Sequence, residues 1–155
     1  MINNKYISLI GFIIVTFSAS AIGGLTTRIY KEPWYCSIIK PSFNPPDWVF
    51  APVWSTLYLF MSVAIWLIWI NEKRTKNIFA IYFVHLFINA TWSIFFFGLH
   101  QILVSLIVIL IIIFFIIWLM RLYFEINKFS FILMVPYLLW CSYAFVLNLS
   151  LFILN

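Results

Sequence analysis

The feature that most restricts the fold of this chain is an unbroken apolar run from Ile102 to Leu119. In these 18 residues only Ser105 is polar, and none carries a charge. A run of this length can cross the hydrocarbon core of a bilayer as an α-helix, whereas a surface helix of a soluble domain keeps one polar face. A transmembrane β-barrel would instead show short segments of alternating hydrophobicity. The run therefore predicts a membrane-spanning helix.

Composition indicates that the rest of the chain has the same environment. Of the 155 residues, 66% are hydrophobic and 8% are charged, compared with about 45–50% and about 25% in soluble domains. So few charged residues cannot cover a water-facing surface, which excludes a soluble cytosolic enzyme. We predict an all-α integral membrane protein, a single domain over residues 1–155 built from five transmembrane helices. The expected spans are about 7–25, 48–70, 78–97, 102–122 and 129–154.

The basic residues predict how the chain is oriented. With five spans, the N-terminus and the second and fourth connections share one side, which holds six Lys and Arg residues against three on the other. The positive-inside rule then places the N-terminus in the cytoplasm and the C-terminus outside. This distribution also accounts for the net charge of +5 without a nucleic-acid partner. Alternatively, Lys5 and the small residues Ser18–Ala21 resemble a cleaved signal peptide, which would leave four helices.

The connection of residues 28–47 differs from a simple linker. Its four prolines disfavour a continuous helix. We expect Asn44 to cap the second span, with Pro45 in the first turn and Asp47 near the positive end of the helix dipole. The connection also carries apolar side chains that would be unfavourable in water, so we predict a structured lid over one end of the bundle. These side chains are Trp34, Tyr35, Ile38, Ile39 and Phe43.

Three of the predicted helices carry a largely aromatic stripe at helical spacing. The stripes are Phe50, Trp54, Tyr58 and Met61; His85, Asn89, Trp92 and Phe96; and Tyr137, Trp140, Ala144 and Leu147, with Asn148 beside the last. Polar groups at membrane depth turn away from lipid, so His85 and Asn89 direct the second stripe inward. The stripes predict a cavity suited to a flat apolar ligand with a polar edge. A solid core or a dimer contact would produce the same pattern.

The predicted spans hold no acid–base or metal-binding constellation. The four acidic residues fall in connections or at helix ends, which leaves no paired carboxylates inside the membrane. They are Glu32, Asp47, Glu72 and Glu125. Cys36 and Cys141 lie outside any CxxC or Cys/His cluster, so no metal site is expected and no cofactor is required. His85, without an acid partner, indicates a hydrogen-bonded structural residue rather than a haem ligand or proton relay.

A long motif runs through the lid and the second span. It reads W-Y-x4-K-P-x3-P-P-x-W-V-F-x3-W-x2-L-Y from Trp34 to Tyr58. Two further motifs are Asn89-x2-Trp92 with Phe96-Phe97-Gly98, and Pro136-Tyr137-x2-Trp140 with Leu147-Asn148. In these motifs the chain resembles the translocator protein family, also known as the tryptophan-rich sensory proteins and, in animals, the peripheral benzodiazepine receptor. The resemblance covers essentially the whole chain.

This resemblance implies a five-helix membrane fold, commonly a homodimer, with a ligand pocket closed by the first loop. The implied partners, besides the lipid bilayer, are porphyrins such as protoporphyrin IX, sterols and synthetic isoquinoline carboxamides. The pocket positions that match are Trp54, Asn89, Trp92, Trp140 and Ala144, with Tyr35 as a lid contact. Trp54 and Trp140 match tryptophans linked to light-dependent porphyrin degradation in some members. His85 departs from the family pattern, because many members have Gln there.

The leading hypothesis is a membrane receptor or carrier, in a bacterial cell membrane, that binds tetrapyrroles and other flat hydrophobic molecules under the first loop. The predicted ligand contacts are Tyr35, Phe50, Trp54, Tyr58, His85, Asn89, Trp92, Phe96, Tyr137, Trp140 and Ala144. In one alternative, porphyrin is the substrate of a light-dependent degrading enzyme with Trp54 and Trp140 as catalytic residues. In another, the chain is a structural or regulatory membrane partner whose stripes are helix contacts and which has no ligand.

Overall fold

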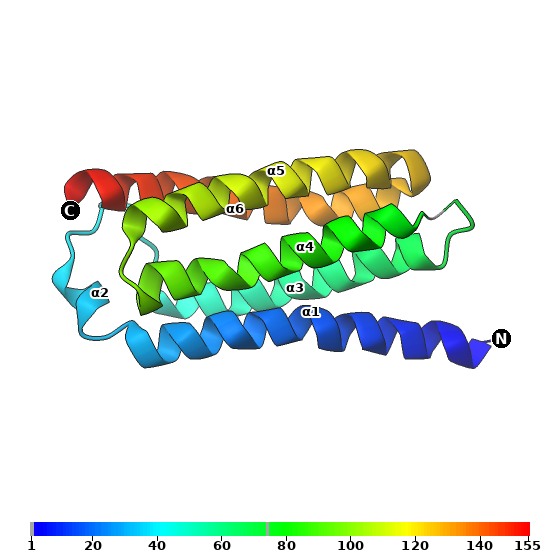
Figure 1. Ribbon diagram of the computed structural model, residues 1–155, viewed down its shortest axis with the longest axis horizontal. Coiled ribbons are helices and arrows are strands. Elements are labelled where there is room, and N and C mark those ends of the chain that lie inside the picture. Colours follow the sequence, from blue (N-terminus) through cyan, green and yellow to red (C-terminus); the bar gives the residue numbers. More distant parts are fainter. Residues whose placement is uncertain (1, 74) are drawn as a thin grey trace.

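The computed structural model describes residues 2–73 and 75–155, and Figure 1 shows long helices side by side in an elongated bundle. The five long helices are α1 (Ile2–Tyr30), α3 (Asp47–Trp69), α4 (Lys76–Ser93), α5 (Ile102–Ile126) and α6 (Lys128–Leu154). A π-helical turn, η1 (Ile94–Gly98), extends α4. All five are long and apolar enough to cross a membrane, and the described residues contain no strand. The predicted all-α class is confirmed.

The helices extend beyond the predicted spans. The helix α1 begins before residue 7 and ends after residue 25, and α5 continues past residue 122 to Ile126. The other three helices, with η1 counted as part of α4, agree with their spans to within two residues. Hydropathy marks only the segment that suits hydrocarbon, whereas the helical hydrogen bonding continues into the polar flanking turns.

The bundle has a closely packed half and a half that lies under the lid. The helix α5 packs against α4 and α6, while α1 packs against α3 and α4. Side chains with no exposed surface, such as Met61, Tyr82, Ile116 and Met134, fill the half away from the lid. In Figure 1 the C-terminus lies at the same end as α2, and the N-terminus lies at the opposite end. This is the arrangement expected for five spans.

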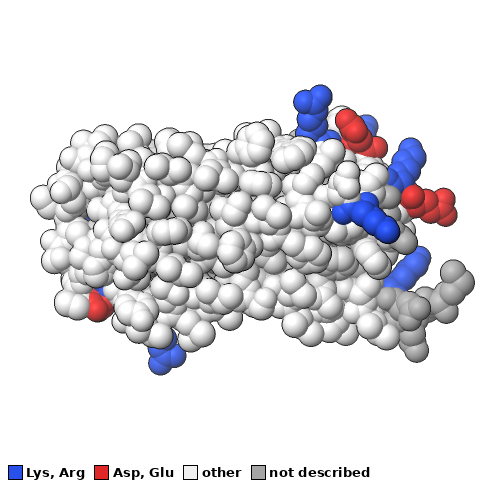
Figure 2. All heavy atoms as spheres, in the orientation of Figure 1, with Lys and Arg blue, Asp and Glu red and all other residues white. Residues whose placement is uncertain are grey.

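The outward faces of the helices are apolar. Ile14, Phe114 and Leu139 are each at least 60% exposed, at 63%, 60% and 65%. On the face that Figure 2 shows, the visible Lys, Arg, Asp and Glu side chains lie toward the two ends of the bundle, with a band free of charge between them. An apolar band bounded by charged ends is the surface that a bilayer requires. The chain is therefore a multi-pass membrane protein.

The connection between α1 and α3 is a structured lid, as predicted. Its single helical turn, α2 (Trp34–Ser37), buries Tyr35. The Tyr143 hydroxyl of α6 donates a hydrogen bond to the Phe43 carbonyl oxygen, at 2.7 Å. The Asn155 side chain accepts from the Ile39 backbone N–H at 2.8 Å and donates to the Ile39 carbonyl at 2.9 Å. The lid is thus attached at two places, to Tyr143 of α6 and to Asn155 directly after this helix.

The prediction that Asn44 caps the second span is wrong. The helix α3 begins at Asp47, Pro46 occupies the N-cap position, and no side chain caps the first turn. Pro46 has an extended ψ of 145°, so Pro45 cannot lie in the first turn and only Asp47 is placed there as expected. The Asn44 side-chain oxygen instead accepts a hydrogen bond from the Tyr35 hydroxyl at 3.0 Å. Asn44 therefore stabilises the lid rather than the helix.

Candidate ligand-binding cavity

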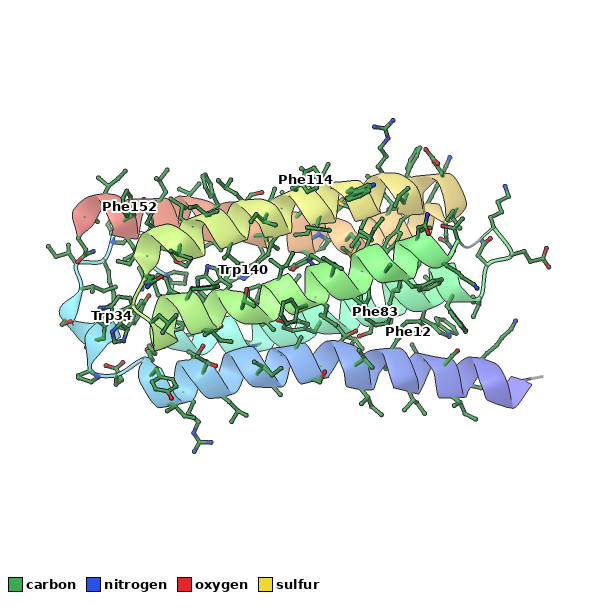
Figure 3. All side chains as sticks on the ribbon, viewed as in Figure 1. Phe12, Trp34, Phe83, Phe114, Trp140 and Phe152 are labelled. Carbon is green, nitrogen blue, oxygen red and sulfur yellow. The ribbon has the colours of Figure 1, made fainter. Side chains whose placement is uncertain are left out.

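A cavity of about 430 Å³ lies between the helices in the half of the bundle under the lid. This volume is within the range of about 300–1,000 Å³ that small-molecule sites occupy. Nine of the eleven predicted ligand contacts line it: Tyr35, Phe50, Trp54, Tyr58, Asn89, Trp92, Phe96, Trp140 and Ala144. Figure 3 shows Trp140 inside the bundle and Trp34 in the lid at its end. The three stripes thus surround one space.

Aromatic rings form much of the cavity wall. Trp92 and Phe96, one turn apart, are stacked with ring centroids 5.0 Å apart, and the lid residue Trp34 meets Phe96 edge-on at 5.4 Å. On the other side Trp54 packs against Tyr58 at 5.6 Å. Such contacts hold each ring in a fixed orientation, so the wall presents defined faces and edges to a ligand. Phe96 belongs to η1, and π-helical turns of this kind occur frequently at functional sites.

A chain of polar side chains crosses the cavity floor. The Asn89 side-chain oxygen accepts from the Tyr58 hydroxyl at 2.5 Å, and its amide nitrogen donates to the Tyr137 hydroxyl at 2.7 Å. His85 Nε2 lies 2.9 Å from the same Tyr137 hydroxyl. Tyr58 and Asn89 line the cavity, whereas His85 and Tyr137 are fully buried below it and do not. His85 therefore supports Asn89 through Tyr137.

Replacing His85 tests this supporting role. His85→Leu removes one of the two hydrogen-bond partners of the Tyr137 hydroxyl, leaving only Asn89. It should lower the free energy of unfolding by about 0.5–2 kcal/mol, the range of interhelical hydrogen bonds in membranes. His85→Gln keeps a polar group that can reach the hydroxyl, so it should cost clearly less. Denaturant unfolding in detergent measures both variants. Equal destabilisation by Leu and Gln would show that the contact with Tyr137 does not contribute.

The helix α1 contributes lining residues that the sequence did not predict. They are Ser20, Gly23, Gly24, Thr27 and Arg28, and Lys31 lines the cavity directly after the end of the helix. A side chain built on Gly23 would meet Ser93 Oγ at 3.2 Å, whereas one built on Gly24 would meet nothing within 4 Å. Small residues thus allow α1 to pack on α4 at Gly23 and leave open space at Gly24. Gly23 and Gly24 were the one signal in the sequence that this part of α1 lines a cavity, since glycine inside a helix usually has a packing or functional reason.

The lid end of the cavity is charged. Lys31 forms an ion pair with Asp47, and both residues line the cavity. The Tyr35 ring lies close to two ammonium groups, with Lys31 Nζ at 5.2 Å and Lys40 Nζ at 4.6 Å from its centroid. Burial raises the pKa of the Tyr35 hydroxyl, although its hydrogen bond to Asn44 opposes this effect. Tyr35 is therefore a neutral hydrogen-bond donor at physiological pH.

The chemistry available to the cavity depends on its metal-binding and polar groups. Within residues 2–73 and 75–155, no three His, Cys, Asp or Glu side chains lie close enough to hold a metal ion. The indole nitrogen of Trp140 is buried and has no hydrogen-bond partner among these residues. A buried donor of this kind usually has a partner. The cavity can therefore hold an apolar ring system and bond polar atoms at its edge.

Fold and site together define a multi-pass helical membrane protein with an aromatic cavity between its helices and a loop over the cavity. The sequence matches the TspO/MBR family over residues 12–154. The chain belongs to this family, which confirms the resemblance seen in the motifs.

Relatives of the chain come from bacteria and animals. The tryptophan-rich protein TspO of Chlorobaculum tepidum is 34% identical, over 98% of this chain and 99% of its own length. Protein CrtK of Rhodobacter capsulatus is also 34% identical, over 91% of each chain. The translocator protein of Bos taurus is 28% identical, over 92% of this chain and 87% of its own length. The similarity thus extends over nearly the whole length of each protein.

Proposed function

We propose that the chain is a membrane receptor or carrier that binds porphyrins, with protoporphyrin IX as the reference ligand. The observation that carries this proposal is the aromatic cavity of about 430 Å³ between the helices under the lid. Flat rings stack favourably on aromatic faces, and a few polar groups suffice to orient them. Other flat hydrophobic molecules, such as sterols and isoquinoline carboxamides, would compete for the same space.

In this proposal Trp54 and Trp140 hold the ligand by ring contact. Trp54 is supported by Tyr58 and by Tyr137, whose ring centroid is 6.2 Å away, and Trp140 is supported by Phe50 at 6.0 Å. Asn89 can bond a polar atom of the ligand at the cavity floor, because an amide group has more donor and acceptor capacity than its bonds to Tyr58 and Tyr137 use. His85 acts only through Tyr137.

The double variant Trp54→Phe/Trp140→Phe tests the proposal. Phe keeps a ring but loses contact area, so affinity for protoporphyrin IX in the dark should fall about tenfold. The measurement is a titration of purified protein followed by porphyrin absorbance and by quenching of the remaining tryptophans. The matched control is Trp48→Phe/Trp118→Phe, because these tryptophans are 74% and 41% exposed on the outer surface. If both double variants bind protoporphyrin IX with wild-type affinity, Trp54 and Trp140 do not contact the ligand.

A second candidate function is light-dependent degradation of bound porphyrin, with oxygen as the oxidant. The observation that favours it is the contact of Trp54 with two tyrosines, Tyr58 and Tyr137, which places three oxidisable rings together. Illumination of the titrated samples separates the candidates. If the porphyrin spectrum disappears only under illumination and only when Trp54 and Trp140 are present, the result supports the enzyme. A spectrum that stays unchanged under illumination supports the receptor or carrier. Absence of any saturable binding would favour a structural partner.

The orientation and assembly belong to the same proposal. We place the N-terminus in the cytoplasm and the lid with the C-terminus outside a bacterial cell membrane, because six basic residues lie on the N-terminal side and three on the lid side. We also propose a homodimer, as the family resemblance implies. Light scattering of the detergent-purified protein with correction for bound detergent gives the number of chains.

A further inference from the structure

The cavity has an opening on one side of the bundle. Five of its lining residues are exposed, and all five belong to α1 or α3: Gly24, Arg28, Asp47, Ala51 and Ser55. The lining residues of α4, α5 and α6 are buried or half-buried. The two helices run in opposite directions, so these residues form two facing rows, which we call the α1–α3 opening.

The side chains along the α1–α3 opening are small except at the lid end. Gly24 on α1 and Ala51 and Ser55 on α3 carry little or no side chain, and a Cβ at Gly24 would touch nothing within 4 Å. The Ser55 hydroxyl donates to the Ala51 carbonyl at 2.8 Å, which satisfies it within its own helix. The edge of a flat ligand can therefore lie between the two rows without losing a hydrogen bond there.

Among the residues that line the lid end of the α1–α3 opening, the two cations Arg28 and Lys31 outnumber the single carboxylate, Asp47. Lys31 forms an ion pair with Asp47, and its Nζ also lies 3.9 Å from Oε1 of Glu32, which does not line the cavity. Arg28 lies one turn beyond Gly24 and, among the residues that the structure describes, forms no hydrogen bond, ion pair or ring contact. The Arg28 guanidinium thus remains available, and its fork of donors matches the geometry of a carboxylate.

We propose that Arg28 binds a carboxylate of the ligand at the lid end of the α1–α3 opening, so that the cavity selects flat hydrophobic acids over neutral molecules of the same shape. This inference rests on the proposed function and adds the charge of the ligand to it. The apolar body of the ligand lies in the aromatic cavity, and its acidic edge points along the opening toward the aqueous end of the bundle. The negative charge of Asp47 disfavours a second ligand carboxylate at this end. Such a carboxylate could bind here only if Lys31 left Asp47 and paired with the ligand instead.

The test compares protoporphyrin IX with its dimethyl ester, which has the same ring system and no carboxylate. Both are titrated in the dark against wild-type protein and variants in nanodiscs of zwitterionic lipid. Arg28→Gln should weaken binding of the acid about five- to tenfold and leave binding of the ester within about twofold. Arg28→Lys should keep most of the preference for the acid, because it keeps the charge. Asp47→Asn should increase the preference for the acid, because it removes a protein carboxylate that competes with the ligand carboxylate for the cations at this end.

Lys40→Gln is the matched control. Lys40 is a cation of the same end, placed over the Tyr35 ring, but it does not line the cavity. Its removal should leave the ratio of the two affinities unchanged. If Arg28→Gln weakens binding of the acid and of the ester equally, or weakens neither, the proposed carboxylate contact is wrong, while the proposed porphyrin cavity stands. Unchanged binding of both is the result expected if Arg28 contacts only lipid phosphates. If wild-type protein binds neither ligand saturably, the proposed function fails and this inference fails with it.

Discussion

Replacing Ala144 with Phe should lower affinity for protoporphyrin IX on the order of 100-fold, which corresponds to about 2.7 kcal/mol. Ala144 lies on α6 one turn after Trp140, is half-buried and lines the cavity. A benzyl group at this position occupies space that a ligand ring would need. Because it extends into an existing cavity rather than into close-packed side chains, the thermal unfolding midpoint without ligand should be unchanged or higher.

The control for this variant is Ala80→Phe. Ala80 lies on an exposed part of α4 and does not line the cavity, so the same change in size is made on the outer surface. Isothermal or fluorescence titration of both variants gives the affinities, and a thermal scan without ligand gives the midpoints. Wild-type affinity in a folded Ala144→Phe protein would place the porphyrin outside this cavity. An equal loss in Ala80→Phe would mean that the effect is not specific to the cavity.

The direction of the aromatic stripes was predictable from the sequence. Phe50, Trp54 and Tyr58 recur every four residues, which places them on one face of a helix, and all three line the cavity. On α4 the polar Asn89 fixed the inward face, because hydrocarbon cannot satisfy an amide. Periodicity and polarity together therefore identified most of the aromatic residues of the lining, without knowledge of how the helices pack.

Depth within the bundle was not predictable in the same way. His85 and Asn89 lie one turn apart on a single stripe, yet only Asn89 reaches the cavity. Tyr137 of α6 fills the space beside His85, with the two rings 5.5 Å apart. A stripe gives the direction of a side chain, whereas the side chains of neighbouring helices decide whether it meets a cavity or close packing.

The parts formed by small residues and by distant contacts also escaped prediction. Gly24 and Ser20 of α1 line the cavity because they leave space, and small side chains produce no hydrophobic pattern. The attachment of the lid joins Ile39 to Asn155, which are 116 residues apart. Local signals such as proline spacing predict where the lid begins and ends, but the sequence contains no signal for its partner on α6.

The proposed orientation has an all-or-none test in the two native cysteines. Cys36 is exposed in the lid, whereas Cys141 is buried in α6. If the lid lies outside, a membrane-impermeant maleimide added to spheroplasts should label Cys36 nearly completely, and Cys36→Ser should abolish the labelling. Inside-out vesicles should remain unlabelled until detergent is added. The reverse result would place the N-terminus outside and contradict the positive-inside prediction.

The pH dependence of this labelling tests the effect of Glu32 on the Cys36 thiol. A hydrogen bond to the Glu32 carboxylate raises the pKa of the Cys36 thiol. The thiolate is the reactive form, so a raised pKa leaves less of it at neutral pH and the rate should increase as the pH rises above 7. Glu32→Gln removes the carboxylate, lowers the pKa toward its ordinary value and should accelerate labelling at pH 7. A rate that Glu32→Gln leaves unchanged would show that this hydrogen bond does not control the thiol.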